Sequence, residues 1–341
     1  MTNADSLTPP AATTDANDLD LLVERAAVSA RAHGVGVTVE RAAPLVGGHS
    51  GLTIGADLVR ADGSVRRIVI KAAPPGRAGV GRHDVMRQAR LYRTLASFDG
   101  VRVPEVILGE ESDPPFFAMS RLEGEAIEPI LAEDDPLDHT VVRPRMLGAA
   151  SMLAALHGPD ALVLDLEVPR SVGDELAQWS RTLGAVDPDL VVGGVELRDR
   201  LERSMPADGK LSVIHGDYRL GNILCLGEEL QGIIDWEIWG VADPRLDLGW
   251  FLIHADASNY PGIGVEVADM PSPDELLAAY EDASGSAVEA WQWFDAFGRF
   301  KMAAIMAHNL RRHREGRHVD PFQERLPPTI AHLIETGRDR L

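Results

Sequence analysis

The sequence reads LSVIHGDYRLGNILC at residues 211–225 and GIIDWE at residues 232–237. Residues 223–225 and 232–234 are short apolar runs, which are typical of buried strands. Residues 226–231, which lie between them, contain a glycine and polar side chains and predict the turn of a hairpin. We therefore expect a β-hairpin with polar residues on both sides of it.

Three polar side chains are expected to meet beside this hairpin. Asn222 comes just before its first strand and Asp235 just after its second, so both belong to the open end. Asp217 lies in a glycine-containing loop with His215, directly after a predicted strand at residues 211–214. Two carboxylates and a carboxamide form an all-oxygen set that suits Mg²⁺ and phosphates, whereas zinc favours histidine and cysteine. We predict that Asp217 orients and deprotonates an attacking hydroxyl while Asn222 and Asp235 hold the metal.

The segment from His215 to Asn222, followed by the Asp-Trp-Glu at residues 235–237, resembles the catalytic core of the aminoglycoside phosphotransferase and choline kinase family. The resemblance implies an α+β, protein-kinase-like fold with two lobes, a small antiparallel β-sheet lobe and a larger, mainly helical lobe. It also implies ATP and Mg²⁺ as cofactors, with His215 and Asp247 as structural support for the catalytic loop. The competing interpretation is that Asp217 and Asn222 only make turn hydrogen bonds.

Two departures from protein kinases indicate the kind of substrate. Gly216 stands where protein kinases have the arginine that receives an activation-loop phosphate. Asp235 and Asp247 are only 12 positions apart, which is too short for a segment that docks a peptide. We therefore expect a kinase that phosphorylates a hydroxyl of a small molecule.

The region before the catalytic segment predicts the nucleotide-covering lobe, residues 18–122, which ends in a hinge. Gly47, Gly48 and Ser50 lie between two predicted strands, in a loop that resembles the phosphate-covering loop of the family. Lys71 matches the strand lysine that pairs the α- and β-phosphates, although an ordinary edge-strand lysine is the alternative. The predicted strands of this lobe are residues 43–46, 53–60, 65–72, 103–108 and 116–120, and its helices are residues 18–33 and 83–98.

The partner of Lys71 departs from the family pattern. Gln88 occupies the helix position where a glutamate is expected, so either Gln88 holds Lys71 by a neutral hydrogen bond or Asp84 supplies the charge. At the end of the lobe, the resemblance implies that the Ser120 carbonyl and the Leu122 amide bind the adenine edge.

The remaining regions are simpler. Residues 1–17 lack the basic and apolar parts of a secretory signal, so we expect a disordered tail and a cytoplasmic location. Residues 123–341 predict the helical lobe that carries the catalytic and acceptor sites. Cys225 is the only cysteine, which excludes an intramolecular disulfide and predicts a buried structural thiol.

Composition limits the partners. The formal charge is −20, which argues against a nucleic-acid partner because such proteins need basic surfaces. No apolar run is long enough to span a bilayer, so no membrane partner is expected. The expected partner is a small-molecule hydroxyl substrate, and the oligomeric state stays open.

The identity of the acceptor depends on the last helices. Phe297, Lys301 and His308 share one face of a predicted helix at residues 287–314, and we interpret Lys301 as a lysine that extends from a core stripe to solvent. The aspartate-rich run at residues 235–250 resembles the branch related to kinase-like domains fused to acyl-CoA dehydrogenases. That branch implies a hydroxyacyl-type metabolite. An aminoglycoside phosphotransferase, a nucleotide-binding pseudokinase or regulatory module, and a helical scaffold without a nucleotide site are the alternatives.

Overall fold

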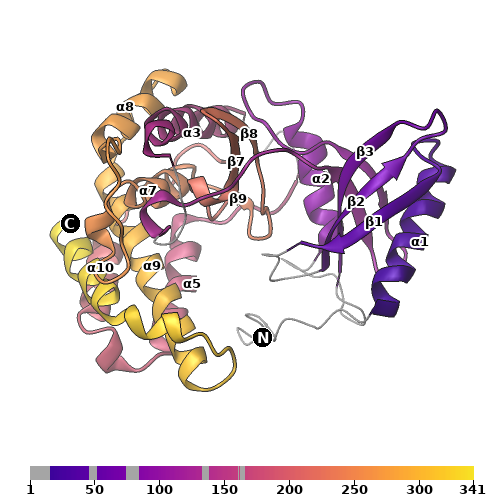
Figure 1. Cartoon of the computed structure of the whole chain (residues 1–341). Coiled ribbons are helices and arrows are strands. Elements are labelled where there is room, and N and C mark those ends of the chain that lie inside the picture. The colour runs from indigo at the N-terminus through magenta and orange to yellow at the C-terminus, as the bar shows by residue number, and fades with distance from the viewer. Residues whose placement is uncertain (1–15, 46–51, 74–83, 133–137, 160, 162–165) are drawn as a thin grey trace. The chain divides into compact units, whose positions relative to one another are not determined.

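Five strands pair into one antiparallel sheet in the computed structural model of the protein (Figure 1). The structure describes residues 16–45, 52–73, 84–132, 138–159, 161 and 166–341. The strand order is β1-β2-β3-β5-β4, and all neighbours are antiparallel. The strands are β1 (Thr38–Pro44), β2 (Leu52–Val59), β3 (Val65–Ala72), β4 (Val106–Glu110) and β5 (Phe116–Ser120).

Strand alternation explains which side chains of this sheet face which helix. Ile68 and Ile70 of β3 are buried in one core with the apolar side chains of α1 (Ala16–Ala32). Because neighbouring residues of a strand point to opposite faces, Lys71 lies on the other face. There its side chain contacts Gln88 of α2 (Val85–Leu95). The alternation thus separates a mainly apolar face from the face that carries Lys71.

The described residues divide into two units. The first comprises the described residues within 1–97, 102–123 and 232–238, and the second comprises the other described residues. A single boundary at residue 122 is therefore too simple, because residues 232–238 belong with the sheet. The amide of Ile233 donates to the carbonyl of Arg102 at 2.9 Å, which ties this late segment to the first unit. The first helix also begins at residue 16, so residues 16 and 17 are helical, and residues 1–15 lie outside the described part.

The second unit is mainly helical. Its helices are α3 (Val142–His157), α5 (Val172–Gly184), α6 (Gly194–Arg203), α7 (Arg245–Ile253), α8 (Pro273–Ser284), α9 (Trp291–Arg314) and α10 (Pro327–Asp339). Short 3₁₀ turns connect them, namely η2 (Pro129–Leu131), η3 (His139–Val141), η4 (Pro188–Leu190), η5 (Leu220–Asn222), η6 (Ala257–Asn259) and η7 (Pro321–Arg325). Helix α9 is buried on most of its surface and forms the centre of the core.

Two small ribbons carry the catalytic segment. Strand β6 (Ser212–Ile214) pairs with β9 (Gly240–Ala242), and β7 (Ile223–Leu226) pairs with β8 (Glu229–Ile233). The hairpin is tighter than expected, since β8 begins at residue 229 and only two residues form the turn. Gly227 adopts a positive φ of 59° there, which is the conformation that a two-residue hairpin turn requires.

Helices α7 and α9 cross with their backbones in close contact. A Cβ atom added at Gly249 would lie 2.2 Å from the carbonyl oxygen of Phe294, and one added at Gly298 would lie 3.0 Å from the carbonyl oxygen of Gly249. Glycine is therefore needed at this crossing. The close approach brings Trp250, which follows Gly249, next to Lys301, which follows Gly298 by three residues.

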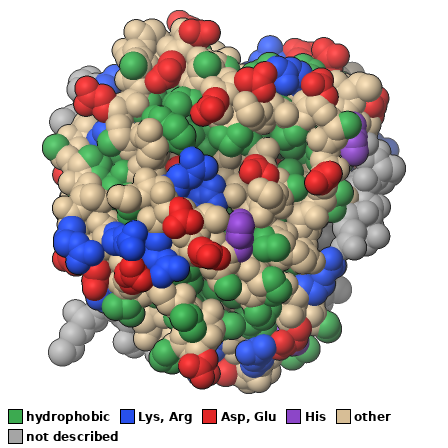
Figure 2. All heavy atoms as spheres, turned by 90° about the vertical axis from the view of Figure 1, so that its left-hand side faces the viewer, with side chains coloured by type: hydrophobic (Ala, Val, Ile, Leu, Met, Phe, Trp, Pro, Cys, Tyr) green, Lys and Arg blue, Asp and Glu red, His purple; other side chains and the backbone are tan. Residues whose placement is uncertain are grey.

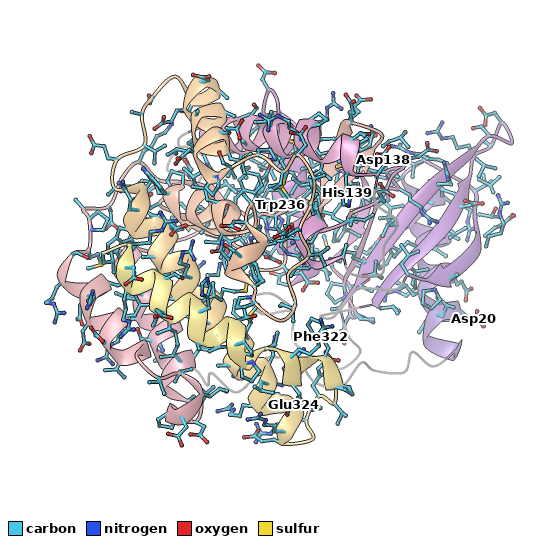
Figure 3. All side chains as sticks on the ribbon, turned by 60° about the vertical axis from the view of Figure 1, so that its left-hand side comes forward. Asp20, Asp138, His139, Trp236, Phe322 and Glu324 are labelled. Carbon is cyan, nitrogen blue, oxygen red and sulfur yellow. The ribbon has the colours of Figure 1, made fainter. Side chains whose placement is uncertain are left out.

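The arginine-rich end of α9 is paired with acids. Arg314 donates to both carboxylate oxygens of Glu324 at 2.8 and 2.7 Å, and Glu324 lies with Phe322 in η7 (Figure 3). Arg312 is only 7% exposed, so this helix end is less solvated than its sequence suggests. On the face drawn in Figure 2, acidic and basic side chains are interspersed.

Within the part of the chain that the structure describes, none of the helices has both the length and the apolar character needed to cross a membrane.

Candidate active site

Lys71 is the charged centre of the first unit. The residue is 8% exposed, and its ammonium donates to Oε1 of Gln88 at 3.2 Å. Oε1 of Glu237 lies 3.5 Å away and Oδ1 of Asp235 lies 3.9 Å away. Asp84, the other candidate partner, is instead the N-cap of α2. Its carboxylate accepts from the backbone amide of Arg87 in that helix at 2.9 Å. The neutral contact with Gln88 is therefore supplemented by two carboxylates from the segment after β8.

The backbone at Asp235 is unusual. Its φ is 64°, a left-handed conformation that non-glycine residues adopt rarely and that often marks functional positions. The next residue, Trp236, is fully buried, and its indole N–H donates to the carbonyl of Ile233 at 3.2 Å (Figure 3). The carboxylate of Asp235 stays 47% exposed. The buried indole thus anchors a turn whose acid is half-exposed.

In the second unit, Asp247 organises the loop that follows β6. Its carboxylate accepts from the backbone amide of His215 at 2.5 Å and from that of Gly216 at 2.8 Å. Gly216 has a φ of 83°, which a side chain would strain. The ring of His215 is fully buried, and its Nδ1 accepts from the amide of Asp217 at 3.2 Å. Asp247 and His215 together determine where Asp217 lies.

The carboxylate of Asp217 is held by donors on both oxygens. Oδ1 accepts from the indole N–H of Trp250 at 2.9 Å and lies 3.3 Å from Nε of Arg219. Oδ2 accepts from Nδ2 of Asn222 at 2.9 Å. Burial opposes ionisation, but Arg219 and other nearby charges outweigh it and hold the pKa of Asp217 below its usual value. An ionised, oriented carboxylate can accept a proton from a bound hydroxyl.

The side-chain amide of Asn222 uses its nitrogen and its oxygen differently. Its Nδ2 carries both amide protons, and these are directed to the backbone carbonyl of Asp217 at 2.8 Å and to the carboxylate of the same residue. Oδ1 is therefore the atom that can face a cation. An amide oxygen here and the exposed carboxylate of Asp235 are the ligand types that Mg²⁺ prefers, so the residues present fit that metal.

Across the described ranges, no three or more His, Cys, Asp and Glu side chains gather as a metal-binding cluster.

Arg219 and Glu128 were not identified from the sequence. Oε2 of Glu128 lies 3.6 Å from Arg219 and accepts from the amide of Gly221 at 3.2 Å. Burial raises the pKa of Glu128 to about 7, against the opposing effect of Arg219. Arg219 thus lies between two acids, one of which is Asp217.

The other predicted positions are distributed as follows. Ser120 ends β5, and its hydroxyl accepts from the amide of Glu105 at 2.9 Å. Leu122 lies two residues further on. Its side chain packs against Gly232, so closely that a Cβ atom added to that glycine would collide with it. Gly47, Gly48 and Ser50 lie outside the described residues. The expectation for Cys225 is confirmed, because the thiol is buried and burial raises its pKa to about 11.

Lys301 corrects an expectation. Its side chain is 7% exposed rather than extended to solvent, and Nζ donates to the carbonyl oxygen of Gly216 in the catalytic loop. Because lysine is scarce in this chain, the presence of a lysine at position 301 was itself a signal of a specific role. Nothing in the local sequence, however, indicates which loop the lysine reaches.

Comparison with known families agrees with this geometry. The model of the phosphotransferase enzyme family matches residues 54–297, which is more than half of the chain. The chain belongs to this family.

The match includes Lys71 and the whole segment from His215 to Asp247. This confirms the resemblance that the His-Gly-Asp and Asp-Trp-Glu motifs indicate.

Individual relatives place the chain further. It is similar to a probable acyl-CoA dehydrogenase, IBR3 of Arabidopsis thaliana, with 27% identity over 273 residues, which cover 71% of this chain and 33% of that protein. The chain thus spans about a third of the length of this relative. The predicted kinship with acyl-CoA dehydrogenase proteins is confirmed.

Solved structures establish the fold. A putative aminoglycoside phosphotransferase from Ralstonia eutropha superposes with a TM-score of 0.75 and 20% identity, covering 93% of this chain and 98% of that one. A thermostable aminoglycoside phosphotransferase mutant in ternary complex with ADP and hygromycin B has a TM-score of 0.57 and 16% identity, covering 92% and 97%. The predicted α+β, protein-kinase-like fold is confirmed.

Proposed function

We propose that this phosphotransferase is a kinase that uses ATP and Mg²⁺ to phosphorylate a hydroxyl of a small molecule. The observation that carries the proposal is the carboxylate of Asp217, which donors from Trp250, Arg219 and Asn222 hold in one orientation. In phosphoryl transfer to a hydroxyl, a carboxylate in this role orients the attacking hydroxyl and accepts its proton as a base. The ADP complex of the hygromycin-bound relative supports an adenine nucleotide.

Each remaining residue has a role in this proposal. Lys71 binds the α- and β-phosphates of the nucleotide, and Asn222 and Asp235 supply oxygen ligands to Mg²⁺. When bound, the metal supplies positive charge that neutralises the phosphate oxygens. His215 and Asp247 hold the loop so that Asp217 meets the hydroxyl without reorganisation.

The nucleotide contacts are completed by backbone groups. Gly47, Gly48 and Ser50 would cover the phosphates, and the Ser120 carbonyl and Leu122 amide would bind the adenine edge. The sheet supports the latter pair, because Ser120 is the last residue of β5 and Leu122 follows it.

The acceptor is the finer part of the proposal. We favour a hydroxyacyl-type metabolite, because the relative that shares 27% identity is named a probable acyl-CoA dehydrogenase. An aminoglycoside is the alternative, since the structural neighbours carry that name. We place the enzyme in the cytoplasm without a membrane partner, and the charge of −20 argues against a nucleic-acid partner.

A nucleotide-binding pseudokinase is the second candidate. The neutral Gln88 in contact with Lys71 favours it, because a neutral partner positions a lysine less firmly than a charged one. Glu237 and Asp235 beside the same ammonium favour the active enzyme.

A turnover screen distinguishes the two candidates. The protein is incubated with ATP and Mg²⁺ and with hydroxyacyl compounds or aminoglycosides, and ADP release is measured. We expect Asp217→Asn to lower kcat by roughly 10²- to 10⁴-fold, while the exposed control Asp187→Asn leaves it unchanged. Thermal stabilisation by Mg-ATP without turnover on any acceptor would instead support the pseudokinase.

A further inference from the structure

An indole N–H is one of the donors that hold the catalytic carboxylate. Nε1 of Trp250 donates to Oδ1 of Asp217 at 2.9 Å, and the Trp250 side chain is 4% exposed. Trp250 comes from α7, directly after the glycine at which that helix contacts α9. A buried, rigid donor of this kind limits the carboxylate to one orientation.

The ammonium of Lys301 lies on the face of the same indole. Its Nζ is 4.2 Å from the ring centroid of Trp250 and 5.5 Å from that of Trp179. The same nitrogen donates to the carbonyl oxygen of Gly216, the residue before Asp217. One cation therefore contacts both the loop that carries Asp217 and the donor that orients it.

Burying this cation is costly for the fold. Lys301 is 7% exposed, and burial lowers its pKa. Glu175, Asp247 and Asp217 oppose this effect by their charge, but within the described part of the chain none of them forms an ion pair with Lys301. A buried charge without an ion-pair partner destabilises a protein. Groups of this kind concentrate at functional sites.

The helix crossing explains how Lys301 reaches the loop. Gly249 and Gly298 let the backbones of α7 and α9 approach closely. Lys301 follows Gly298 by three residues, so both lie on the same face of α9. The lysine stem therefore passes the crossing and places its ammonium against Trp250.

We propose that Lys301 and Trp250 form a positioning pair for Asp217. The ammonium fixes the indole through a cation–π contact, and the indole N–H fixes the carboxylate. The ammonium also withdraws electron density from the ring, which strengthens the N–H as a donor. This inference rests on the proposed function, because it takes Asp217 as the residue that meets the acceptor hydroxyl.

The first test is a double-mutant cycle in kcat, measured as ADP release with ATP and Mg²⁺. Trp250→Phe keeps a smaller aromatic ring and removes the indole N–H, and Lys301→Met keeps the stem and removes the charge. Each is expected to lower kcat by on the order of tenfold with little change in KM for ATP. The double variant is expected to lose no more than the larger single effect. Lys301→Arg is expected to restore activity in part, and the exposed lysine control Lys210→Met is expected to change nothing.

The second test does not need turnover. The protein contains six tryptophans, and the indole ¹⁵N–H signal that Trp250→Phe removes identifies Trp250. We expect this signal to exchange slowly with solvent, and to shift and exchange faster in both Lys301→Met and Asp217→Asn.

The outcomes separate the two proposals. A wild-type protein without turnover on any acceptor overturns the proposed function, whereas the indole signal still reports on the pair. Additive effects in the kcat cycle, or a Trp250 signal that ignores both variants, overturn the positioning pair even when the wild type is active.

Discussion

The ammonium nitrogen of Lys71 lies 3.5 Å from Oε1 of Glu237, a residue 166 positions later in the chain. Gln88 contacts the same nitrogen at 3.2 Å without a charge. Gln88 stands at the helix position where the family pattern has a glutamate, and Glu237, from the segment after β8, supplies the missing carboxylate. Glu237 is 15% exposed at its side chain, so its attraction for Lys71 is only partly screened by solvent.

This relationship predicts that Glu237, and not Asp84, supports nucleotide binding. Glu237→Gln removes the negative charge that holds the ammonium of Lys71 and is expected to lower kcat/KM for ATP by about tenfold. This corresponds to about 1.4 kcal/mol of lost transition-state stabilisation. Asp84→Ala removes an N-cap and is expected to cost about 1 kcal/mol of stability without changing kcat/KM for ATP. Steady-state kinetics and urea unfolding of both variants provide the measurement. Equal kinetic losses in the two variants would contradict the assignment.

Much of the fold follows from local patterns. The expected strands at residues 65–72 and 116–120 match β3 and β5 at both ends. These elements have strong apolar periodicity and clear turn residues at their ends, so local sequence is sufficient to define them. The His-Gly-Asp motif likewise marks Asp217 because its loop depends on a glycine with a positive φ.

The supporting contacts could not be read from the sequence in the same way. Lys301 contacts Gly216 across 85 positions, and Glu237 contacts Lys71 across 166. Such contacts depend on how helices pack, and periodicity reports only that a residue lies on a buried face. For Lys301, the glycines at the α7–α9 crossing convert an expected surface lysine into a buried one.

Asp247 is predicted to be essential for stability as well as for the loop. Asp247→Ala leaves the amides of His215 and Gly216 buried without their acceptor, which is expected to cost about 3 kcal/mol in the free energy of unfolding. Asp247→Asn retains one acceptor oxygen and is expected to lose less. Urea unfolding measures both. The exposed control Asp282→Ala should stay within about 0.5 kcal/mol of the wild type, and an equally small effect at Asp247 would contradict the prediction.

The α7–α9 crossing is predicted to tolerate no side chain at Gly249. Gly249→Ala places a Cβ atom 2.2 Å from the backbone oxygen of Phe294, so the two helices must separate. We expect a loss of about 3 kcal/mol or more, which is the upper range for overpacking. Gly184→Ala is the matched control, because a Cβ there meets nothing within 4 Å. That control is expected to be neutral or to stabilise the helix by up to about 1 kcal/mol. A similar melting temperature for both variants would show that the crossing can relax.

Glu128 is predicted to make stability depend on pH. Burial raises its pKa to about 7 in the folded protein, from an ordinary value of 4.5. The folded state therefore binds the proton more tightly than the unfolded chain does. The stabilisation from this group is complete below pH 4.5 and is lost as the pH rises through 7. The shift corresponds to roughly 3 kcal/mol.

Comparison of Glu128→Gln with the wild type isolates this effect from the other acids. Glutamine keeps the shape of the side chain and an acceptor for the amide of Gly221, but it does not titrate. Urea unfolding is measured at pH 5 and at pH 7.5. The wild type should lose more stability between these two pH values than the variant does. The exposed residue Glu228 provides the control, since Glu228→Gln should follow the wild-type pH dependence. If Glu128→Gln also follows it, the carboxyl group is already ionised at pH 5 and is stabilised by Arg219 more strongly than burial opposes it.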